Sequence, residues 1–319
     1  MMPLLALTLA PAACELAGGE VRKRGASENS TPSRHVARPE PGATAVLIGA
    51  GDIASCGSHD DDDDGRWNGG SGVELTARLL DSLVPGNAPV AVFTTGDNAY
   101  GEGTARQFAS CYDPSWGRHK SVTRPAPGNH DYKTKGARGY FDYFGSNAGP
   151  GRRGYYSYDL GDWHIISLNS EISMARGSAQ EEWLRDDLAA TTKQCVLAYW
   201  HEPRFSSGKH GSSTVPAPLW EALYEHHAEI IVNGHDHHYE RFAPQTPGGQ
   251  RDEARGIRQF VVGTGGRKLR KFKSAIANSE VRYNATYGVL KLTLSADGYR
   301  WEFVSVSGAV PDSGSGTCR

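Results

Sequence analysis

Five short apolar segments of this chain each lead into Asp, Asn or His, and this arrangement limits the fold more than any other feature. The polar ends of the segments are Gly51-Asp52, Gly96-Asp97-Asn98-Ala99-Tyr100, Gly128-Asn129-His130-Asp131, Tyr199-Trp200-His201 and Gly234-His235-Asp236-His237. A glycine before the polar residue lets the chain turn sharply where a strand ends, and it lets the backbone approach an ion. Carboxylates and imidazoles together suit first-row transition metals. The segments therefore predict a metal site at the ends of strands.

The rest of the body alternates between expected strands and expected helices. Apolar residues of 73–83 fit one helical stripe, and further helices are expected at 181–190 and 218–227. Hairpins are expected at 155–168 and 289–306. Short buried strands are expected at 46–48, 90–93, 196–200, 230–232 and 260–262. This alternation predicts a mixed α/β chain with one core.

Charge and hydropathy argue against two classes of protein. The 34 Lys and Arg residues nearly balance the 36 Asp and Glu residues, and the net charge is −2. A near-neutral chain lacks the broad basic surface that captures nucleic acid, so no nucleic-acid partner is expected. No run of 18 apolar residues occurs, so no ordinary transmembrane helix is expected. With 38% hydrophobic and 22% charged residues, the composition fits an ordinary globular protein.

The first residues resemble an export signal. Residues 3–13 are almost wholly apolar, are too short to span a bilayer, and end in Ala12-Ala13 before Cys14. We therefore expect a signal peptide or lipoprotein signal at 1–14, with a lipid anchor at Cys14 as the open alternative. Residues 15–43 are polar and aperiodic and are expected to form a disordered linker. The functional domain is expected at 44–319, in a secreted or cell-surface protein.

Cysteine usage fits export. With Cys14 set aside, four cysteines remain, which permits two disulfides in three pairings. We favour Cys56 with Cys111, because both follow acidic loop motifs. Cys195 would then pair with Cys318 and hold the C-terminal segment in place.

The order of the five motifs resembles that of the calcineurin-like metallophosphoesterases, and within them the purple acid phosphatase branch. The resemblance covers about residues 45–308 and includes Gly-Asp, Gly-Asp-x-x-Tyr, Gly-Asn-His-Asp, a strand-closing His and Gly-His-x-His. Many relatives outside the branch carry a histidine where this chain has Ala54, and the purple branch uses the tyrosine at the position of Tyr100 instead. The resemblance implies a four-layer α/β/β/α sandwich of two mixed sheets flanked by helices.

The resemblance also implies a dinuclear metal site. The first metal ion would be bound by Asp52, Asp97, Tyr100 and His237, and the second by Asp97, Asn129, His201 and His235. Asp97 would bridge the two ions, which lets two cations lie close together. A phenolate oxygen from Tyr100 favours Fe³⁺ on its side, whereas the other side accepts Zn²⁺, Mn²⁺ or Fe²⁺.

Such a site hydrolyses phosphate esters by attack of a metal-activated hydroxide on phosphorus. A histidine near the leaving oxygen would donate a proton. His130 is the first candidate and His210, on the loop 203–213, is the second, with a solvent-exposed loop histidine as its alternative. Asp131 is expected to orient His130. Arg204 is a candidate phosphate contact or a surface arginine, and Asn129, His130 and His210 are further candidate substrate contacts.

Two other segments lie close to these motifs in the sequence. Residues 263–266 lack the spacing of a dinucleotide-binding loop and predict a strand-end turn near the rim of the site. The basic cluster at 267–273 is interpreted either as an exposed face or as a region that attracts phosphate.

Two functions remain open on the sequence. One is an exported phosphatase acting on small phosphomonoesters, with phosphodiesters as a second substrate class. The other is an inactive metal-binding module that recognises a partner outside the cell. The sequence predicts no oligomeric state.

Overall fold

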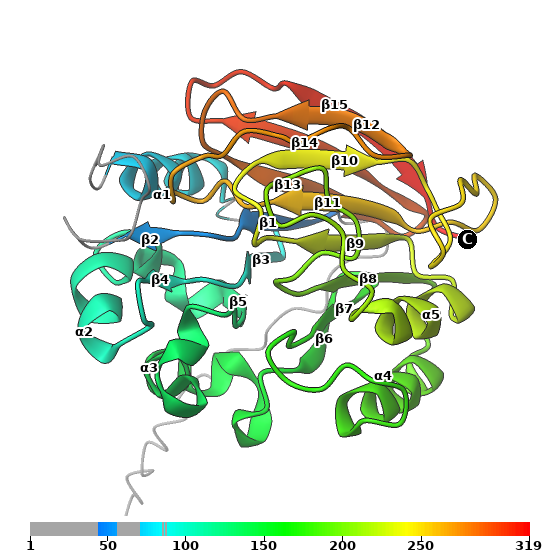
Figure 1. Cartoon of the computed structure of the whole chain (residues 1–319), viewed down its shortest axis with the longest axis horizontal. Helices are drawn as coiled ribbons and strands as arrows, with labels where there is room; N and C mark the ends of the chain where they lie inside the picture. Colours follow the sequence, from blue (N-terminus) through cyan, green and yellow to red (C-terminus); the bar gives the residue numbers. More distant parts are fainter. Residues whose placement is uncertain (1–43, 56–70, 85, 87) are drawn as a thin grey trace, which may run out of the picture. The chain divides into compact units, whose positions relative to one another are not determined.

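The computed structural model describes residues 44–55, 71–84, 86 and 88–319 (Figure 1). The expected signal segment at 1–14, the expected linker at 15–43 and Cys56 lie outside these residues. The signal segment, the linker and the pairing of Cys56 with Cys111 therefore stay predictions. The described residues form an α/β fold with two mixed sheets, as expected.

The first sheet has six strands in the order β15-β14-β13-β1-β3-β5. Strands β1, β3 and β5 run parallel, and β13 pairs antiparallel with β1. All six residues of β1 are buried, as in a strand covered on both faces. The strands are β1 (Ala45–Ala50), β3 (Val90–Thr95), β5 (Thr123–Ala126), β13 (Gly288–Ser295), β14 (Gly298–Ser305) and β15 (Asp312–Thr317).

The second sheet has seven strands in the order β12-β10-β11-β9-β8-β7-β6, of which β7, β8, β9 and β11 are parallel. A separate pair of two-residue strands, β2 (Ala54–Ser55) and β4 (Ala99–Tyr100), lies beside the ends of β1 and β3. The strands of the second sheet are β6 (Tyr156–Leu160), β7 (Trp163–Ser167), β8 (Cys195–Tyr199), β9 (Ile230–Asn233), β10 (Tyr239–Phe242), β11 (Arg258–Val262) and β12 (Ser279–Tyr283).

Strand β8 shows how the layers pack. Successive side chains of a strand point to opposite faces of its sheet. Leu197 belongs to a core that also contains Ile48 and Phe93 of the first sheet. Val196 and Ala198 belong to a second core, which contains apolar residues of α4 and α5. The two sheets therefore pack face to face, and α4 and α5 cover the outer face of the second sheet.

The helices lie outside the two sheets. The α-helices are α1 (Ser71–Leu83), α2 (Ala105–Gln107), α3 (Arg138–Phe144), α4 (Ala179–Ala190) and α5 (Ala217–Glu225). Short π- or 3₁₀-helical segments are Phe108–Tyr112, Trp116–Val122, Asp131–Lys133, Lys135–Ala137, Gly145–Ala148 and Pro150–Arg152. No helix of the described residues has the length and apolar character needed to cross a membrane.

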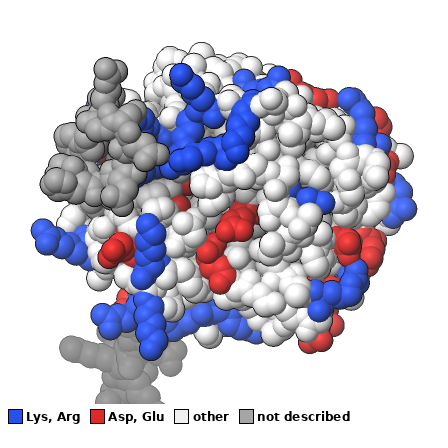
Figure 2. All heavy atoms as spheres, viewed as in Figure 1, with Lys and Arg blue, Asp and Glu red and all other residues white. Residues whose placement is uncertain are grey.

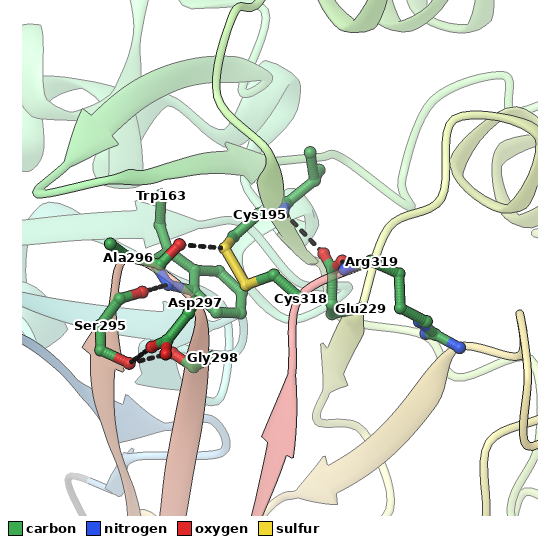
Figure 3. The surroundings of a disulfide bond; sticks show 10 residues. Trp163, Cys195, Glu229, Ser295, Ala296, Asp297, Gly298, Cys318 and Arg319 are labelled. Atoms are coloured by element: carbon green, nitrogen blue, oxygen red, sulfur yellow. Dashed lines mark hydrogen bonds between the residues drawn. A yellow bond between two sulfur atoms is a disulfide. The ribbon is translucent and has the colours of Figure 1, made fainter.

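A disulfide joins the two sheets (Figure 3). It connects Cys195, the first residue of β8, to Cys318, which follows β15, and their Cα atoms lie 5.3 Å apart. The predicted pairing of these two cysteines is confirmed. Beside the disulfide, the carboxylate of Glu229 accepts hydrogen bonds from the backbone amides of Val196 (2.8 Å) and Arg319 (3.0 Å). The C-terminal residues are thus held against the start of β8.

Charged side chains of both signs lie on one face of the described domain. On the face seen in Figure 2, Lys and Arg side chains alternate with Asp and Glu side chains and with larger uncharged areas. Neither sign of charge covers this face continuously.

Candidate metal centre

The candidate ligands lie at the carboxyl ends of parallel strands from both sheets. Asp52, Asp97 and Asn129 follow β1, β3 and β5 of the first sheet within three residues. In the second sheet, His201 lies two residues after the end of β8, and His235 lies two residues after the end of β9. Parallel strands end on the same edge of a sheet, where open α/β sheets bind their ligands. The edges of the two sheets coincide here, so residues distant in sequence converge.

Three of the candidate ligands have unusual backbone conformations. The φ angles of Asp52, Asp97 and His235 are 59°, 51° and 68°. Residues other than glycine rarely adopt this left-handed conformation, which costs energy and is concentrated at functional sites. The conformation of Asp52 is held by a hydrogen bond of 3.1 Å that its backbone amide donates to the Gly96 carbonyl. The fold thus maintains the ligand positions at an energetic cost.

The first group of donors contains Asp52, Tyr100 and His237. The Tyr100 hydroxyl donates a hydrogen bond of 2.6 Å to Asp52 Oδ1. His237 Nε2 lies 3.3 Å from the Tyr100 hydroxyl and 3.3 Å from Asp52 Oδ1. These are the residues that the resemblance places around the first metal ion.

The second group contains Asn129, His201 and His235. Asn129 Oδ1 lies 3.0 Å from His201 Nε2 and 3.2 Å from His235 Nδ1. The two ring nitrogens are 3.2 Å apart. Three donor atoms thus surround one point, as the resemblance implies for the second ion.

Asp97 lies between the two groups. Its Oδ2 is 3.5 Å from His201 Nε2. Donor atoms of Asp52, Asp97 and His201 all lie within 4.8 Å of one another, and the three side chains are buried. The structure therefore brings the seven predicted ligands together, with Asp97 in the place of a bridge.

The histidines present the nitrogens that a metal requires. His201 Nδ1 donates a hydrogen bond of 2.7 Å to the Thr95 carbonyl, and His237 Nδ1 donates one of 2.8 Å to the Lys268 carbonyl. These bonds leave Nε2 of each ring facing the centre, as in histidines that bind metals. Two carboxylates, a phenol, an amide oxygen and three imidazoles therefore form a donor set that fits two transition-metal ions.

Contacts with neighbouring histidines favour the negatively charged form of the two buried aspartates of this centre. Burial alone would raise the pKa of Asp97, but His201 and His130 nearby hold that pKa below its usual value. The pKa of Asp52 is likewise lowered by His237 in spite of burial. Burial and the two carboxylates raise the pKa of the Tyr100 phenol well above its usual value. Buried carboxylates require cationic partners, which metal ions would supply.

The two histidines of the second group differ in their charge. Burial would lower the pKa of His201, but Asp97 raises it well above the ordinary value. Burial and the neighbouring His201 lower the pKa of His235 to about 3. Asp97 thus favours the charged form of His201, whereas burial and the neighbouring His201 favour the neutral form of His235.

His130 lies beside the first group. Its ring centroid is 4.4 Å from that of Tyr100, and its amide donates a hydrogen bond of 2.8 Å to Asp97 Oδ1. Its Nδ1 donates a hydrogen bond of 2.7 Å to the Gly101 carbonyl. Burial lowers the pKa of His130. Its role as proton donor stays a prediction.

Asp131 does not make the contact expected of it. Its Oδ2 accepts hydrogen bonds from the Asn98 side chain (2.9 Å) and from the Gly128 amide (3.0 Å). His130 is oriented instead by the Gly101 carbonyl. The 3₁₀ turn at Asp131–Lys133 directs the carboxylate toward Asn98, where burial raises its pKa to about 7. Asp131 therefore shapes the ligand loop rather than orienting His130.

The two remaining candidates differ in position. The ring centroid of His210 lies 4.1 Å from that of His235, so this histidine is next to the second group. The Arg204 guanidinium donates a hydrogen bond of 2.9 Å to the Ser213 carbonyl and lies 4.6 Å from the Phe205 ring centroid. Arg204 thus braces its own loop, and its contact with phosphate stays a prediction.

Arg267, the first residue of the basic cluster at 267–273, lies at the site, which the sequence had left open for this cluster. Its guanidinium carbon lies 4.7 Å from the centroid of the Tyr100 ring, and the residue is only 8% exposed. Its amide donates a hydrogen bond of 2.8 Å to the Asp52 carbonyl. The signals in the sequence were the basic cluster itself and the glycine-rich turn at 263–266 before it, which we expected near the rim of the site.

Gly128 illustrates why glycines precede the ligands. A Cβ atom at this position would lie 2.4 Å from both the amide nitrogen and Oδ1 of Asp97. Any side chain would therefore displace the residue between the two groups, in agreement with the close approach that the motif predicted.

Comparisons with known proteins agree with this geometry. The family model of the calcineurin-like phosphoesterases matches residues 50–239. Purple acid phosphatase 15 of Arabidopsis thaliana is 28% identical in an alignment 192 residues long that covers 49% of this chain and 36% of that protein. Probable inactive purple acid phosphatase 9 of the same plant is 27% identical in an alignment 139 residues long that covers 40% of this chain and 21% of that protein. The matches thus span well under half the length of these relatives.

A solved structure extends the comparison to the fold. A purple acid phosphatase from yellow lupin seeds has a TM-score of 0.68 to this chain at 20% identity, over 87% of this chain and 55% of that one. This likeness confirms the predicted arrangement of two mixed sheets with helices. The family model and the curated relatives confirm the resemblance drawn from the five motifs.

Proposed function

Because the chain belongs to the calcineurin-like phosphoesterase family, we propose that it is a phosphatase that hydrolyses small phosphate esters at a pair of metal ions. Phosphomonoesters are the first substrate class and phosphodiesters the second. The observation that carries this proposal is the convergence of seven donor side chains into two groups that share Asp97.

The two groups offer different donors. Asp52, Tyr100 and His237 would hold Fe³⁺, because a phenolate is a hard oxygen ligand. Asn129, His201 and His235 would hold Zn²⁺, Mn²⁺ or Fe²⁺. When bound, such a pair of ions activates water and polarises the oxygens of a phosphoryl group.

One candidate proton donor lies beside each group. His130 contacts the ring of Tyr100, and His210 contacts the ring of His235. Either imidazole, when protonated, would donate its proton to the leaving oxygen of a bound ester. The first is held by the Gly101 carbonyl, so its ring orientation is fixed before substrate binds.

The direct test is hydrolysis of an aryl phosphate by protein loaded with iron and zinc or manganese. We expect turnover that chelator abolishes and that metal restores. His130→Ala should lower kcat by about 10²-fold or more if this residue donates the proton. A protein that binds two ions per chain and hydrolyses neither monoesters nor diesters would contradict the proposal.

That negative result would favour the second candidate function, an inactive metal-binding module that recognises a partner outside the cell. The observation in its favour is the similarity to a relative named as probably inactive. The complete donor set around Asp97 favours the phosphatase.

We also propose that the protein is exported. The disulfide between Cys195 and Cys318 supports this, because such bonds persist mainly in oxidising compartments. Fractionation of cells expressing the full chain should place it outside the cytoplasm. Recovery of the full-length chain from the cytosol alone, with both thiols reduced, would contradict export.

A further inference from the structure

Asp236 lies between two candidate ligands, His235 and His237, yet its side chain points elsewhere. It is completely buried. Its Oδ1 accepts a hydrogen bond of 2.9 Å from the backbone amide of His210, and its Oδ2 accepts one of 2.5 Å from the Ser206 hydroxyl. The carboxylate of the ligand segment therefore holds the loop that carries His210.

The loop closes tightly around this carboxylate. The Gly208 amide donates a hydrogen bond of 2.9 Å to the same Ser206 hydroxyl. A Cβ atom on Gly208 would lie 2.4 Å from Asp236 Cγ, so no side chain fits there. The backbone amide of Ser207, the residue before Gly208, donates a hydrogen bond of 2.9 Å to Oε2 of Glu240, a second buried carboxylate. The backbone amides of Ser207 and His210 are thus held by two carboxylates of one segment, those of Glu240 and Asp236.

The loop held by Asp236 reaches the candidate metal centre through the ring of His210. That ring lies against His235, with 4.1 Å between centroids, while its Nε2 is 3.5 Å from an Arg270 Nη atom. Asp236 thus holds the backbone of His210, and the exposed His210 ring contacts the ring of His235 and approaches Arg270.

We propose that Asp236 is a positioning residue that holds His210 over the second group of donors, where His210 faces the substrate. This inference rests on the proposed phosphatase function and adds to it. Asp236 does not touch the substrate. It acts only through His210, and the shape of the hydrogen-bonding group matters rather than its charge.

A kinetic cycle tests this with an aryl phosphate and the metal-loaded protein. Asp236→Ala and His210→Ala should each lower kcat by roughly 10²-fold with little change in KM. The double variant should be no worse than either single variant, because both remove the same interaction. Asp236→Asn should retain kcat within about threefold, because its amide oxygen still accepts from His210 and its NH₂ donates to Ser206.

Asp252→Ala is a matched control. Asp252 also accepts hydrogen bonds from backbone amides, those of Ala254 and Arg255, and from a hydroxyl, that of Tyr224. None of these partners belongs to the candidate centre, so kcat should stay within about twofold. The proposal would be overturned if the fold losses in kcat of Asp236→Ala and His210→Ala multiplied in the double variant. It would also be overturned if Asp236→Asn were as slow as Asp236→Ala.

Hydrogen exchange gives a readout that needs neither metal nor activity. The His210 amide should be protected in the wild type and in Asp236→Asn, and it should exchange at least tenfold faster in Asp236→Ala. Gly208→Ala, which leaves the carboxylate in place, should also expose it. Unchanged protection in both variants would overturn the positioning role. Absence of turnover by wild-type protein would instead overturn the phosphatase function, and exchange would still decide the role of Asp236.

Discussion

The Tyr100 hydroxyl donates a 2.6 Å hydrogen bond to Asp52 Oδ1, and both groups are buried. Burial and the nearby carboxylates keep the phenol protonated by raising its pKa. A cation that binds both oxygens must therefore replace that proton. Metal binding on this side should release a proton and should weaken as the pH falls.

Replacing Tyr100 tests this relationship in two ways. In Tyr100→Phe, protein loaded with iron should lose the visible charge-transfer band of the phenolate. In metal-free protein, the free energy of unfolding should fall by about 1.5–3 kcal/mol, because a buried carboxylate loses a hydrogen bond. Absorption spectra and denaturant titrations measure these effects. Tyr140→Phe, which removes a buried hydroxyl bonded to the Pro125 carbonyl, should leave the band unchanged.

Asp97 should be the residue on which both ions depend. Asp97→Ala should reduce the metal content from two ions per chain to nearly none, whereas His237→Ala should remove only the ion on the Tyr100 side. Metal analysis after desalting measures the count. An Asp97→Ala protein that still retains one tightly bound ion would contradict the position of this carboxylate between the two groups.

Ionisation of the buried Glu229 should make the free energy of unfolding depend on pH. The residue is 1% exposed, and burial raises its pKa from 4.5 to about 7. The unfolded chain loses this proton near pH 4.5 while the folded chain keeps it to about pH 7. The folded state thus binds more protons between these values, and the free energy of unfolding should fall by up to about 3 kcal/mol as the pH rises through the window.

Glu229→Gln should flatten this dependence, because the amide does not ionise. Denaturant unfolding at a series of pH values measures the slope. Glu253→Gln, at an exposed glutamate, should retain the slope of the wild type. Equal slopes in wild type and Glu229→Gln would show that Glu229 is not the group responsible.

The disulfide should stabilise the fold without affecting the metal centre. It closes a loop of 123 residues, and removing it in Cys195→Ala should lower the free energy of unfolding by about 2–5 kcal/mol. The metal content should stay at that of the wild type, because Cys195 begins β8 while His201 follows its other end. A loss below about 1 kcal/mol, or a loss of bound metal, would count against this view.

The five short strands that the sequence predicted outside hairpins are buried along almost their whole length. Segments such as Ala45–Ala50 and Ile230–Asn233 are continuous apolar runs, so their pattern is local. Strand β15 (Asp312–Thr317) has no such run. It exists because Gly314 and Gly316 leave room for the rings of Trp301 and Tyr299 on β14, a relation that only the paired strands reveal.

In the candidate site too, features that depend on the local sequence could be predicted, and features that depend on contacts between remote residues could not. The donor types were visible because each follows its strand directly in the sequence. The role given to Asp131 failed because adjacency to His130 in sequence does not fix side-chain direction within a 3₁₀ turn. The contact of Arg267 with Tyr100 could not be predicted, because the two residues are remote in sequence and only the packed turn brings them together.

The division of ligands between two sheets has a consequence for how the protein matures. The oxygen donors Asp52, Asp97, Tyr100 and Asn129 come from the earlier part of the chain, and the nitrogen donors His201, His235 and His237 come from the later part. Before the later part has folded, the earlier part offers an ion only these four oxygen donors. Metal acquisition should therefore be a late event that follows docking of the two halves, and the ions present where assembly finishes would determine which ones are captured.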